Sequence, residues 1–212
     1  MPVEQIVVGP LETNCYVVSD GNSPEAMIVD AGDDAGRIVR ALTAAGLVPR
    51  VLFSTHGHVD HVAANAELKE RFPQMELALL GDERETLLRP ALNLSLFMGG
   101  SVRPPEPDRL LAEGDGIAFG SLSFRVVALP GHTPGGAAAF GHVDGAPAVF
   151  SGDALFADSI GRHDFPGGDL ETLLAAIRGK LLALPDETRV FPGHGPATTI
   201  GRERRHNPFL AG

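Results

Sequence analysis

The sequence has little cysteine and few basic residues, and both shortages argue against whole classes of protein. Its one cysteine, Cys15, cannot form an internal disulfide, and the apolar residues beside it predict a buried strand in a reducing compartment. The 17 basic residues are outnumbered by 27 acidic residues, which gives a net charge of −10. Because such a surface repels a phosphate backbone, no nucleic-acid partner is expected.

Long apolar runs and an export signal are also missing. The longest apolar runs, near residues 76–80 and 124–129, have the length of strands and fall well below the roughly 18 residues of a membrane-spanning helix. The first ten residues carry Glu4 and Gln5 and are interrupted by Gly9, so they do not resemble a secretory leader. We therefore expect a cytoplasmic protein with no membrane partner.

The hydrophobic pattern predicts an α/β protein. In the first half we expect strands at 3–8, 15–19, 26–29, 51–53 and 77–80, and helices that end at Gly46 or cover 60–71 and 82–88. In the second half we expect strands at 116–119, 123–129, 137–140, 148–151 and 189–191, a helix at 169–184 and a short terminal helix. No linker or repeat interrupts this order, so residues 1–212 are expected to form one domain. Two β-rich halves with outer helices predict an αββα sandwich of four layers.

An irregular segment at residues 93–107 separates the two halves. It carries Leu94, Leu96, Phe97 and Met98, which would give the segment an apolar side. Long loops without regular structure in a compact domain are often functional. Two interpretations therefore stay open, a wall of a functional site or packing onto the core.

The strongest motif is the string His-Gly-His-Val-Asp-His at residues 56–61, between a predicted strand and a predicted helix. In an extended segment residues i and i+2 point the same way, so His56 and His58 can reach one metal ion. As the chain turns into the helix, Asp60 and His61 face a second ion. The motif predicts a site for two metal ions.

Three further candidates share one kind of location, because His132, Asp153 and His194 each follow a predicted strand by one to three residues. Taken alone, each is more often an ordinary turn residue. Together with the upstream motif they form a set of ligands on loops at one end of the sheets, as an active site requires. Imidazole with carboxylate and no thiolate favours two zinc ions, and iron or manganese also fits.

These motifs resemble those of the metallo-β-lactamase-fold hydrolases, and within them the glyoxalase II-like branch of hydroxyacylglutathione hydrolases. The resemblance runs over nearly the whole chain and includes residues 9–16, 55–61, 130–136, 151–156 and 191–195. It implies the αββα fold, with one ion bound by His56, His58 and His132, the other by Asp60, His61 and His194, and Asp153 as the bridge between them.

The resemblance also implies a reaction. A metal-bound water has a pKa near about 7, so a bridging hydroxide held beside the catalytic carboxylates Asp60 and Asp153 would attack a carbonyl without a dedicated base. The ions would stabilise the oxyanion, and a thiolate would leave without prior protonation. We therefore expect hydrolysis of a small anionic thioester, such as an S-acylglutathione.

The sequence departs from this branch in two places. The family has a C-terminal helical domain that supplies part of the glutathione pocket, whereas only residues 195–212 follow the last expected ligand here, so much of that pocket is expected to be missing. Arg162 stands nine residues after Asp153, where the family has a basic residue that contacts glutathione, and it is predicted to bind a substrate carboxylate. Asp164 stands where the family has a tyrosine.

Other activities compete with thioester hydrolysis. An iron-dependent persulfide dioxygenase of the same superfamily and an acyl-homoserine lactonase are the enzyme alternatives. A non-catalytic zinc module is the alternative of another class, and the retention of every expected ligand argues against it. A β-lactamase is disfavoured by the missing export signal, and a nuclease by the acidity of the chain. The oligomeric state is open.

Overall fold

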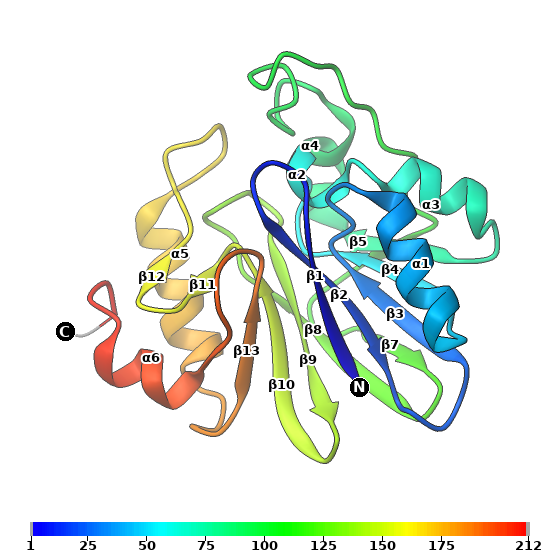
Figure 1. The fold of residues 1–212 in the computed structure, drawn as a ribbon. Helices are drawn as coiled ribbons and strands as arrows, with labels where there is room; N and C mark the ends of the chain where they lie inside the picture. Colours follow the sequence, from blue (N-terminus) through cyan, green and yellow to red (C-terminus); the bar gives the residue numbers. More distant parts are fainter. Residues whose placement is uncertain (1, 211–212) are drawn as a thin grey trace.

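Two six-stranded sheets form the centre of the computed structural model, which describes residues 2–210 (Figure 1). The first sheet has the order β1-β2-β3-β4-β5-β6, with strands β1 (Val3–Val8), β2 (Thr13–Ser19), β3 (Glu25–Val29), β4 (Val48–Ser54), β5 (Glu76–Leu80) and β6 (Arg109–Leu111). The second sheet has the order β14-β13-β10-β9-β8-β7, with strands β7 (Gly116–Phe119), β8 (Leu122–Ala128), β9 (Ala137–Val143), β10 (Ala146–Gly152), β13 (Arg189–Pro192) and β14 (Thr198–Thr199). A small hairpin of β11 (Leu155–Phe156) and β12 (Ser159–Ile160) follows β10.

Helices cover the outer face of each sheet. The helices of the first half are α1 (Ala35–Ala45), α2 (Val59–Val62), α3 (Asn65–Arg71) and α4 (Arg84–Leu88), the last preceded by a 3-10 turn at Gly81–Glu83. The helices of the second half are α5 (Leu170–Ala176), which continues into a π-helical turn at Ile177–Leu181, and α6 (Ile200–His206). The predicted αββα sandwich is confirmed. Among the described residues, no helix has the length and apolarity needed to cross a membrane.

Alternation along the strands separates an inner core from an outer one. In β2, Tyr16 points between the sheets and packs against Phe150 of β10, with ring centroids 5.3 Å apart. Its neighbour Cys15 points the other way, into the layer under α1 and α3, and is fully buried as predicted. Burial raises the pKa of the Cys15 thiol, so it stays protonated and packs as a small apolar group.

Most of the predicted elements are present, and the differences have local causes. The predicted helix at 60–71 is broken, because the amide of Ala64 donates to the carbonyl oxygen of Ala31 (3.0 Å) outside the helix. The predicted helix at 169–184 begins after the cap Asp169, whose carboxylate accepts the amide of Thr172 (2.8 Å). Strands β6, β11, β12 and β14 were not predicted, because two or three residues are too few for a hydrophobic period to be visible.

One edge of the sandwich gathers the carboxyl ends of strands from both sheets. β3 and β4 are parallel in the first sheet, and β10 and β13 are parallel in the second. β8 runs in the same direction as β10, because both are antiparallel to β9. The sheets are joined at this edge by bonds from the amide of Ala137 to Thr55 (2.8 Å) and from the amide of Asn14 to Gly193 (2.7 Å). Loops from both halves therefore meet at one place.

Candidate metal centre

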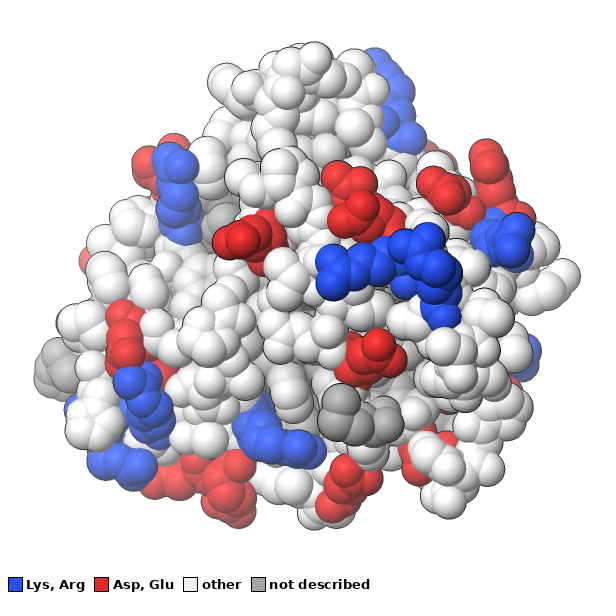
Figure 2. All heavy atoms as spheres, viewed as in Figure 1, with Lys and Arg blue, Asp and Glu red and all other residues white. Residues whose placement is uncertain are grey.

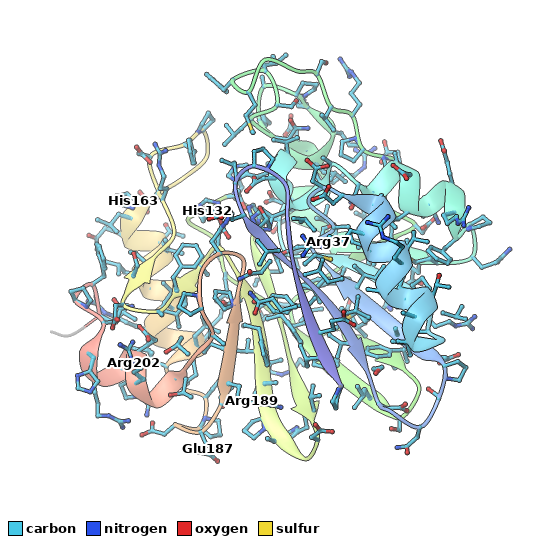
Figure 3. All side chains as sticks on the ribbon, viewed as in Figure 1. Arg37, His132, His163, Glu187, Arg189 and Arg202 are labelled. Carbon is cyan, nitrogen blue, oxygen red and sulfur yellow. The ribbon has the colours of Figure 1, made fainter. Side chains whose placement is uncertain are left out.

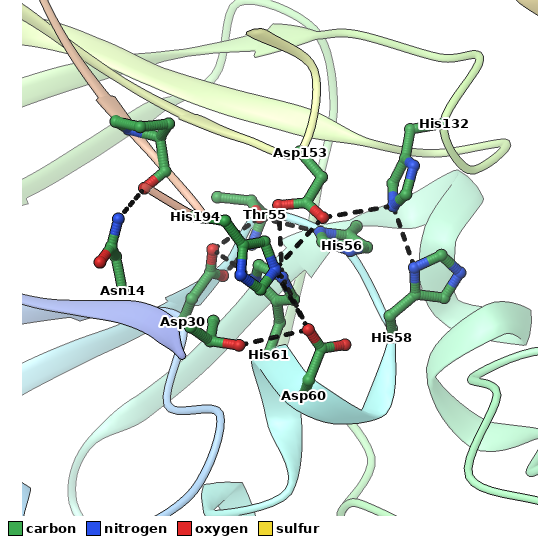
Figure 4. A network of polar contacts seen from close by, with 12 residues as sticks. Asn14, Asp30, Thr55, His56, His58, Asp60, His61, His132, Asp153 and His194 are labelled. Carbon is green, nitrogen blue, oxygen red and sulfur yellow. Dashed lines mark hydrogen bonds and ion pairs between the residues drawn. The ribbon is translucent and has the colours of Figure 1, made fainter. Parts of the chain in front are cut away.

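All of the predicted ligands lie together at this edge (Figure 4). Their ligand atoms form three overlapping groups in which all atoms lie within 4.8 Å of one another, and these are His56 with His58 and His132, His56 with His61 and Asp153, and Asp60 with His61 and His194. His56 follows β4, and Asp60 and His61 lie in α2. His132, Asp153 and His194 follow β8, β10 and β13. The strand ends thus gather side chains separated by more than one hundred residues.

The first group is a cluster of three buried imidazoles. Nδ1 of His58 lies 3.0 Å from Nε2 of His132, and Nε2 of His56 is buried with no hydrogen-bond partner. Burial is the main cause that lowers the pKa of His56, and it lowers the pKa of His58 to about 3 together with the neighbouring His132. These rings are neutral at pH 7, which is the form that binds metal ions.

Asp60, His61 and His194, called the second group from here on, combine two imidazoles with a carboxylate. Nε2 of His194 lies 3.2 Å from Oδ2 of Asp60, and Nε2 of His61 lies 3.5 Å from the same oxygen. The two Nε2 atoms are 3.3 Å apart. Burial alone would lower the pKa of His61, but Asp153, Asp60 and Asp30 outweigh burial and raise it. These carboxylates make the group attractive to a cation.

Asp153 lies between the two groups. Its Oδ1 is 3.3 Å from Nε2 of His61, and its Oδ2 is 3.5 Å from Nε2 of His194 and 3.7 Å from Nε2 of His132. Burial would raise the pKa of Asp153, but the surrounding imidazoles lower it to about 2. The carboxylate is therefore ionised and faces both groups, with Oδ2 beside His132 of the first group and both oxygens beside imidazoles of the second.

The outer nitrogens of the histidines fix where their protons lie. Nδ1 of His61 faces a carboxylate oxygen of Asp30 (3.0 Å), and Nδ1 of His132 and of His194 face the carbonyl oxygens of Arg162 (2.6 Å) and Leu11 (3.1 Å). These acceptors cannot donate, so each Nδ1 carries a proton, and each Nε2 turns inward toward the other ligand atoms, where a metal ion can take the place of a proton. Figure 3 shows His132 beside the yellow segment that contains Arg162.

His56 is oriented through a hydroxyl relay. The hydroxyl of Thr55 donates to Oδ2 of Asp30 (2.8 Å), so its oxygen is free to accept the Nδ1 proton of His56 (3.1 Å). Nε2 of His56 then also turns a lone pair inward. Buried nitrogens and carboxylate oxygens only 3.0–3.7 Å apart form a cluster that metal ions would stabilise. The residues present therefore fit two metal ions.

The segment between β1 and β2 holds the second group in place. The Thr13 hydroxyl donates to Oδ2 of Asp60 (3.2 Å), and the Asn14 amide group donates to the carbonyls of Pro192 and Gly195, both at 2.9 Å. These bonds fix the turn that carries His194. Gly193 in this turn lies so close to the Asp153 carboxylate that a Cβ atom would collide with it. In the motif at residues 9–16, Thr13 and Asn14 thus position Asp60 and the turn that carries His194.

Three functional residues escaped the sequence analysis, namely Asp30, Thr55 and Glu83. Asp30 is 1% exposed and sits at φ 56°, a left-handed conformation that is uncommon for a side chain larger than glycine. Its two oxygens bind His61 and both the amide and the hydroxyl of Thr55. A detectable signal existed, because Asp30 directly follows a predicted strand, as the ligands themselves do.

Glu83 connects the two loops that supply the first group. Its carboxylate is fully buried and accepts the amide of Gly57 (2.9 Å), between His56 and His58, and the amide of Gly135 (2.7 Å), three residues after His132. Burial raises the pKa of Glu83 to about 7, against the lowering effect of these N–H donors. Glu83 also follows a predicted strand by three residues, as the ligands do, but it falls inside the helix predicted at 82–88, where a glutamate is an ordinary residue.

A pocket of about 710 Å³ opens over the site. It is lined by five of the predicted ligands, His58, Asp60, His132, Asp153 and His194, and by Leu11, Val59, Leu94, Phe97, Met98, Phe156, Ser159, Ile160, Arg162, Asp164, Phe165 and Pro166. Its size is typical of small-molecule sites. Arg162 lies at the pocket as the sequence predicted, but its guanidinium is paired with Asp164 through two bonds of 2.9 Å. Its role toward a substrate stays a prediction.

The loop at 93–107 is a wall of this pocket rather than a cover of the core. Leu94, Phe97 and Met98 line the pocket, whereas Leu96, which is exposed to solvent as Phe97 and Met98 are, does not line it. Asn93 anchors the loop, because its side chain donates to the carbonyls of Leu87 and Val102, both at 3.0 Å. Of the two open interpretations, the structure favours the functional one.

Comparisons with known proteins agree with this site. The model of the Metallo-beta-lactamase superfamily matches residues 8–194. The hydroxyacylglutathione hydrolase GloC of Haemophilus influenzae is 38% identical over 214 residues, which cover 99% of this chain and 98% of that protein.

Two solved structures are similar over almost their full lengths. BLEG-1, described as a B3 metallo-beta-lactamase, has a TM-score of 0.93 and 41% identity, with coverage of 99% of this chain and 100% of that chain. The protein TTHA1623, solved in a di-iron-bound form, has a TM-score of 0.85 and 41% identity, with coverage of 98% and 100%. A fold neighbour with two iron ions and the His/Asp cluster of this chain together support a binuclear metal site.

Asp30→Asn tests the orientation of His61. An asparagine that accepts from His61 must turn its NH2 group toward the amide of Thr55, and the opposite orientation loses the His61 bond. We expect metal affinity to fall by about 10- to 100-fold, measured by competition with a chelator. Asp144→Asn, an equal charge change in the exposed turn between β9 and β10, should leave the affinity unchanged. Equal affinities in the two variants would show that Asp30 has no such role.

Glu83→Gln tests the connection between the two loops. The glutamine NH2 group would face the amide of either Gly57 or Gly135, so one buried bond is lost. We expect the free energy of unfolding to fall by about 1–3 kcal/mol, measured by urea unfolding of metal-free protein. The exposed Glu85→Gln, which loses only a surface pair with Arg89, should change it by less than about 0.5 kcal/mol. A similar small effect of both variants would contradict this account of Glu83.

Proposed function

The chain belongs to the metallo-beta-lactamase superfamily, and from this membership we propose that it is a binuclear metallohydrolase that cleaves thioesters of the S-acylglutathione type. The observation that carries the proposal is the convergence of two ligand groups around the Asp153 carboxylate. We propose His56, His58 and His132 for one ion, Asp60, His61 and His194 for the other, and Asp153 as the bridge. Zinc is the favoured metal, with iron and manganese as alternatives.

The side chains supply positioning and charge. Two divalent ions at this site would activate a water molecule and polarise a carbonyl oxygen. Asp60 and Asp153 keep negative charge next to the nucleophile, and the neutral His56, His58 and His132 add none. The pocket then excludes bulk water from one side of the carbonyl carbon. In the reaction water adds to that carbon, the carbon–sulfur bond breaks, and the products are a carboxylate and a thiol.

A thioester suits the groups that line the pocket. The acids among them are Asp60, Asp153 and Asp164, and Asp164 is exposed and ion-paired with Arg162. The pKa of each of these carboxyls is lowered by neighbouring imidazoles or by Arg162, so none is protonated at neutral pH to donate a proton to an amine leaving group, which an amide requires. A thiolate, with a thiol pKa near about 8.5, leaves without one. The similarity to GloC of Haemophilus influenzae supports the same substrate class.

Hydrolysis of β-lactams is the second candidate activity. The sequence disfavoured it for want of an export signal, but BLEG-1, described as a B3 metallo-beta-lactamase, is 41% identical to this chain over almost its whole length. A strained β-lactam amide depends less on an acid than an ordinary amide does. The two activities share the same metal-binding residues, so only the substrate distinguishes them.

A substrate panel with metal analysis tests the proposal. We expect two metal ions per chain and the highest kcat/KM on S-lactoylglutathione or another thioester, with weaker hydrolysis of an acyl-homoserine lactone and a chromogenic cephalosporin. Glutathione persulfide should give no oxygen consumption. Oxygen uptake by protein with one iron ion per chain would contradict the proposal and identify a persulfide dioxygenase. A preference for the cephalosporin would favour the second candidate.

Metal stoichiometry tests the assigned bridge. Asp153 faces both ligand groups, so Asp153→Ala should lose metal from both positions, whereas His194→Ala should deplete mainly the Asp60–His61 position. We expect fewer than one ion per chain in the first variant and about one in the second, measured by elemental analysis after exhaustive dialysis. Equal stoichiometry in the two variants would contradict the bridging role.

A further inference from the structure

The walls of the pocket differ from its floor. The floor consists of the candidate metal ligands, whereas apolar side chains form two facing walls, Leu94, Phe97 and Met98 from the loop at 93–107, and Phe156, Ile160 and Phe165 from the segment after β10. Figure 2 shows the uppermost lobe, which is this loop in Figure 1, as almost free of charged residues on the visible face except at its right edge. If the carbonyl of a substrate lies over the metal ligands, the acyl group and the thiol group attached to it would therefore both contact apolar side chains.

The loop exposes this apolar surface to solvent. Phe97 is 77% exposed and Met98 is 49% exposed, although both lie at the mouth of the pocket. The loop itself is anchored by the buried side chains of Asn93 and Ser95. The side chains of Phe97 and Met98 therefore project from a fixed backbone. Contiguous exposed apolar residues beside a reactive site are typical of a surface that a ligand covers.

Charge at the mouth is cancelled locally. Within residues 2–210, Arg162 is the one Lys or Arg residue that lines the pocket, and its Nε and Nη2 each lie 2.9 Å from an oxygen of Asp164. The guanidinium also stacks over the ring of Phe165, 4.0 Å from its centroid. The pair is exposed, so its hydrogen bonds contribute little free energy. The negative charge of Asp164 nevertheless stays beside Arg162 even when these bonds open. The mouth therefore offers a substrate carboxylate no uncompensated cation.

We propose that this pocket selects thioesters with an uncharged, apolar acyl group, and that Asp164 removes the preference for a glutathione carrier that Arg162 would otherwise confer. This inference rests on the proposed hydrolase function and narrows its substrate class. The acyl chain lies between the two walls, with Phe97 as the residue that covers it. Selection then depends on buried apolar area rather than on charge.

A chain-length series tests the apolar walls. Thioesters of the neutral thiol N-acetylcysteamine with acetyl, butyryl and hexanoyl groups should show kcat/KM rising with length, by up to about fourfold per methylene. Phe97→Ser should remove most of this rise. Leu96→Ser, the same kind of change at an exposed residue of the same loop that does not line the pocket, should keep it. A flat series in the unaltered protein, or equal effects of the two substitutions, would overturn the proposal.

A carrier comparison tests the role of Asp164. In the unaltered protein, hexanoyl-N-acetylcysteamine should have a kcat/KM at least equal to that of S-hexanoylglutathione. Asp164→Asn removes the negative charge that compensates Arg162, so the ratio should shift several-fold toward the glutathione thioester. Asp144→Asn should leave the ratio unchanged. A preference of the unaltered protein for the glutathione carrier, or no shift in Asp164→Asn, would overturn this part of the inference.

Binding measurements separate this inference from the proposed function. Metal-loaded protein is titrated calorimetrically with acetate and with hexanoate, the carboxylates that hydrolysis would release. Tighter binding of hexanoate, lost in Phe97→Ser and kept in Leu96→Ser, supports the apolar acyl site whatever reaction the protein performs. If no thioester is hydrolysed but this binding pattern holds, the proposed function fails alone. Equal binding of acetate and hexanoate would overturn the inference even where thioesters are hydrolysed.

Discussion

The rest of the structure depends on keeping nitrogen lone pairs and carboxylate oxygens turned toward one another in a largely buried site. Crowding imidazoles and carboxylates in this way is unfavourable unless cations or protons lie between them, so the fold must hold each group from outside. It does so with acceptors that hold the Nδ1 proton of a ring, namely Asp30 for His61, the Thr55 hydroxyl for His56, and backbone carbonyls for His132 and His194. The orientation of the site is therefore set by residues that do not belong to it.

This requirement explains where the two sheets are joined. The contacts between Asn14 and the turn at 192–195, and between Ala137 and Thr55, lie at the same edge as the ligands. Glu83 adds a buried carboxylate between the two loops of the three-histidine group. The backbone of Asp30 adopts a left-handed conformation there, a local strain that its several hydrogen bonds offset. Stability and function thus share one set of contacts.

The floor of the pocket carries the candidate metal ligands, whereas its walls would contact the substrate. The floor follows from the strand ends and is built for metal ions, whereas the walls come from the irregular loop at 93–107 and from the β11–β12 hairpin with the residues that follow it, 155–166. Loops tolerate substitution more readily than strand ends, so one floor can serve different substrates. In our proposal, the pairing of Arg162 with Asp164 is an example of a single loop residue that changes what a neighbouring cation can bind. Reaction type and substrate choice are therefore separable here.

The sequence by itself determined the αββα fold and the residues expected at the metal site, because strand periodicity and the spacing of residues 56–61 are local properties of the chain. It also predicted the irregular loop and the place of Arg162. Only the tertiary structure decided what surrounds those residues. Asp30, Thr55 and Glu83 act through contacts between segments that lie 25 or more residues apart, and the pairing of Arg162 depends on the conformation of its loop. Such contacts leave no periodic pattern, because they are fixed by how strands of two sheets end at one edge.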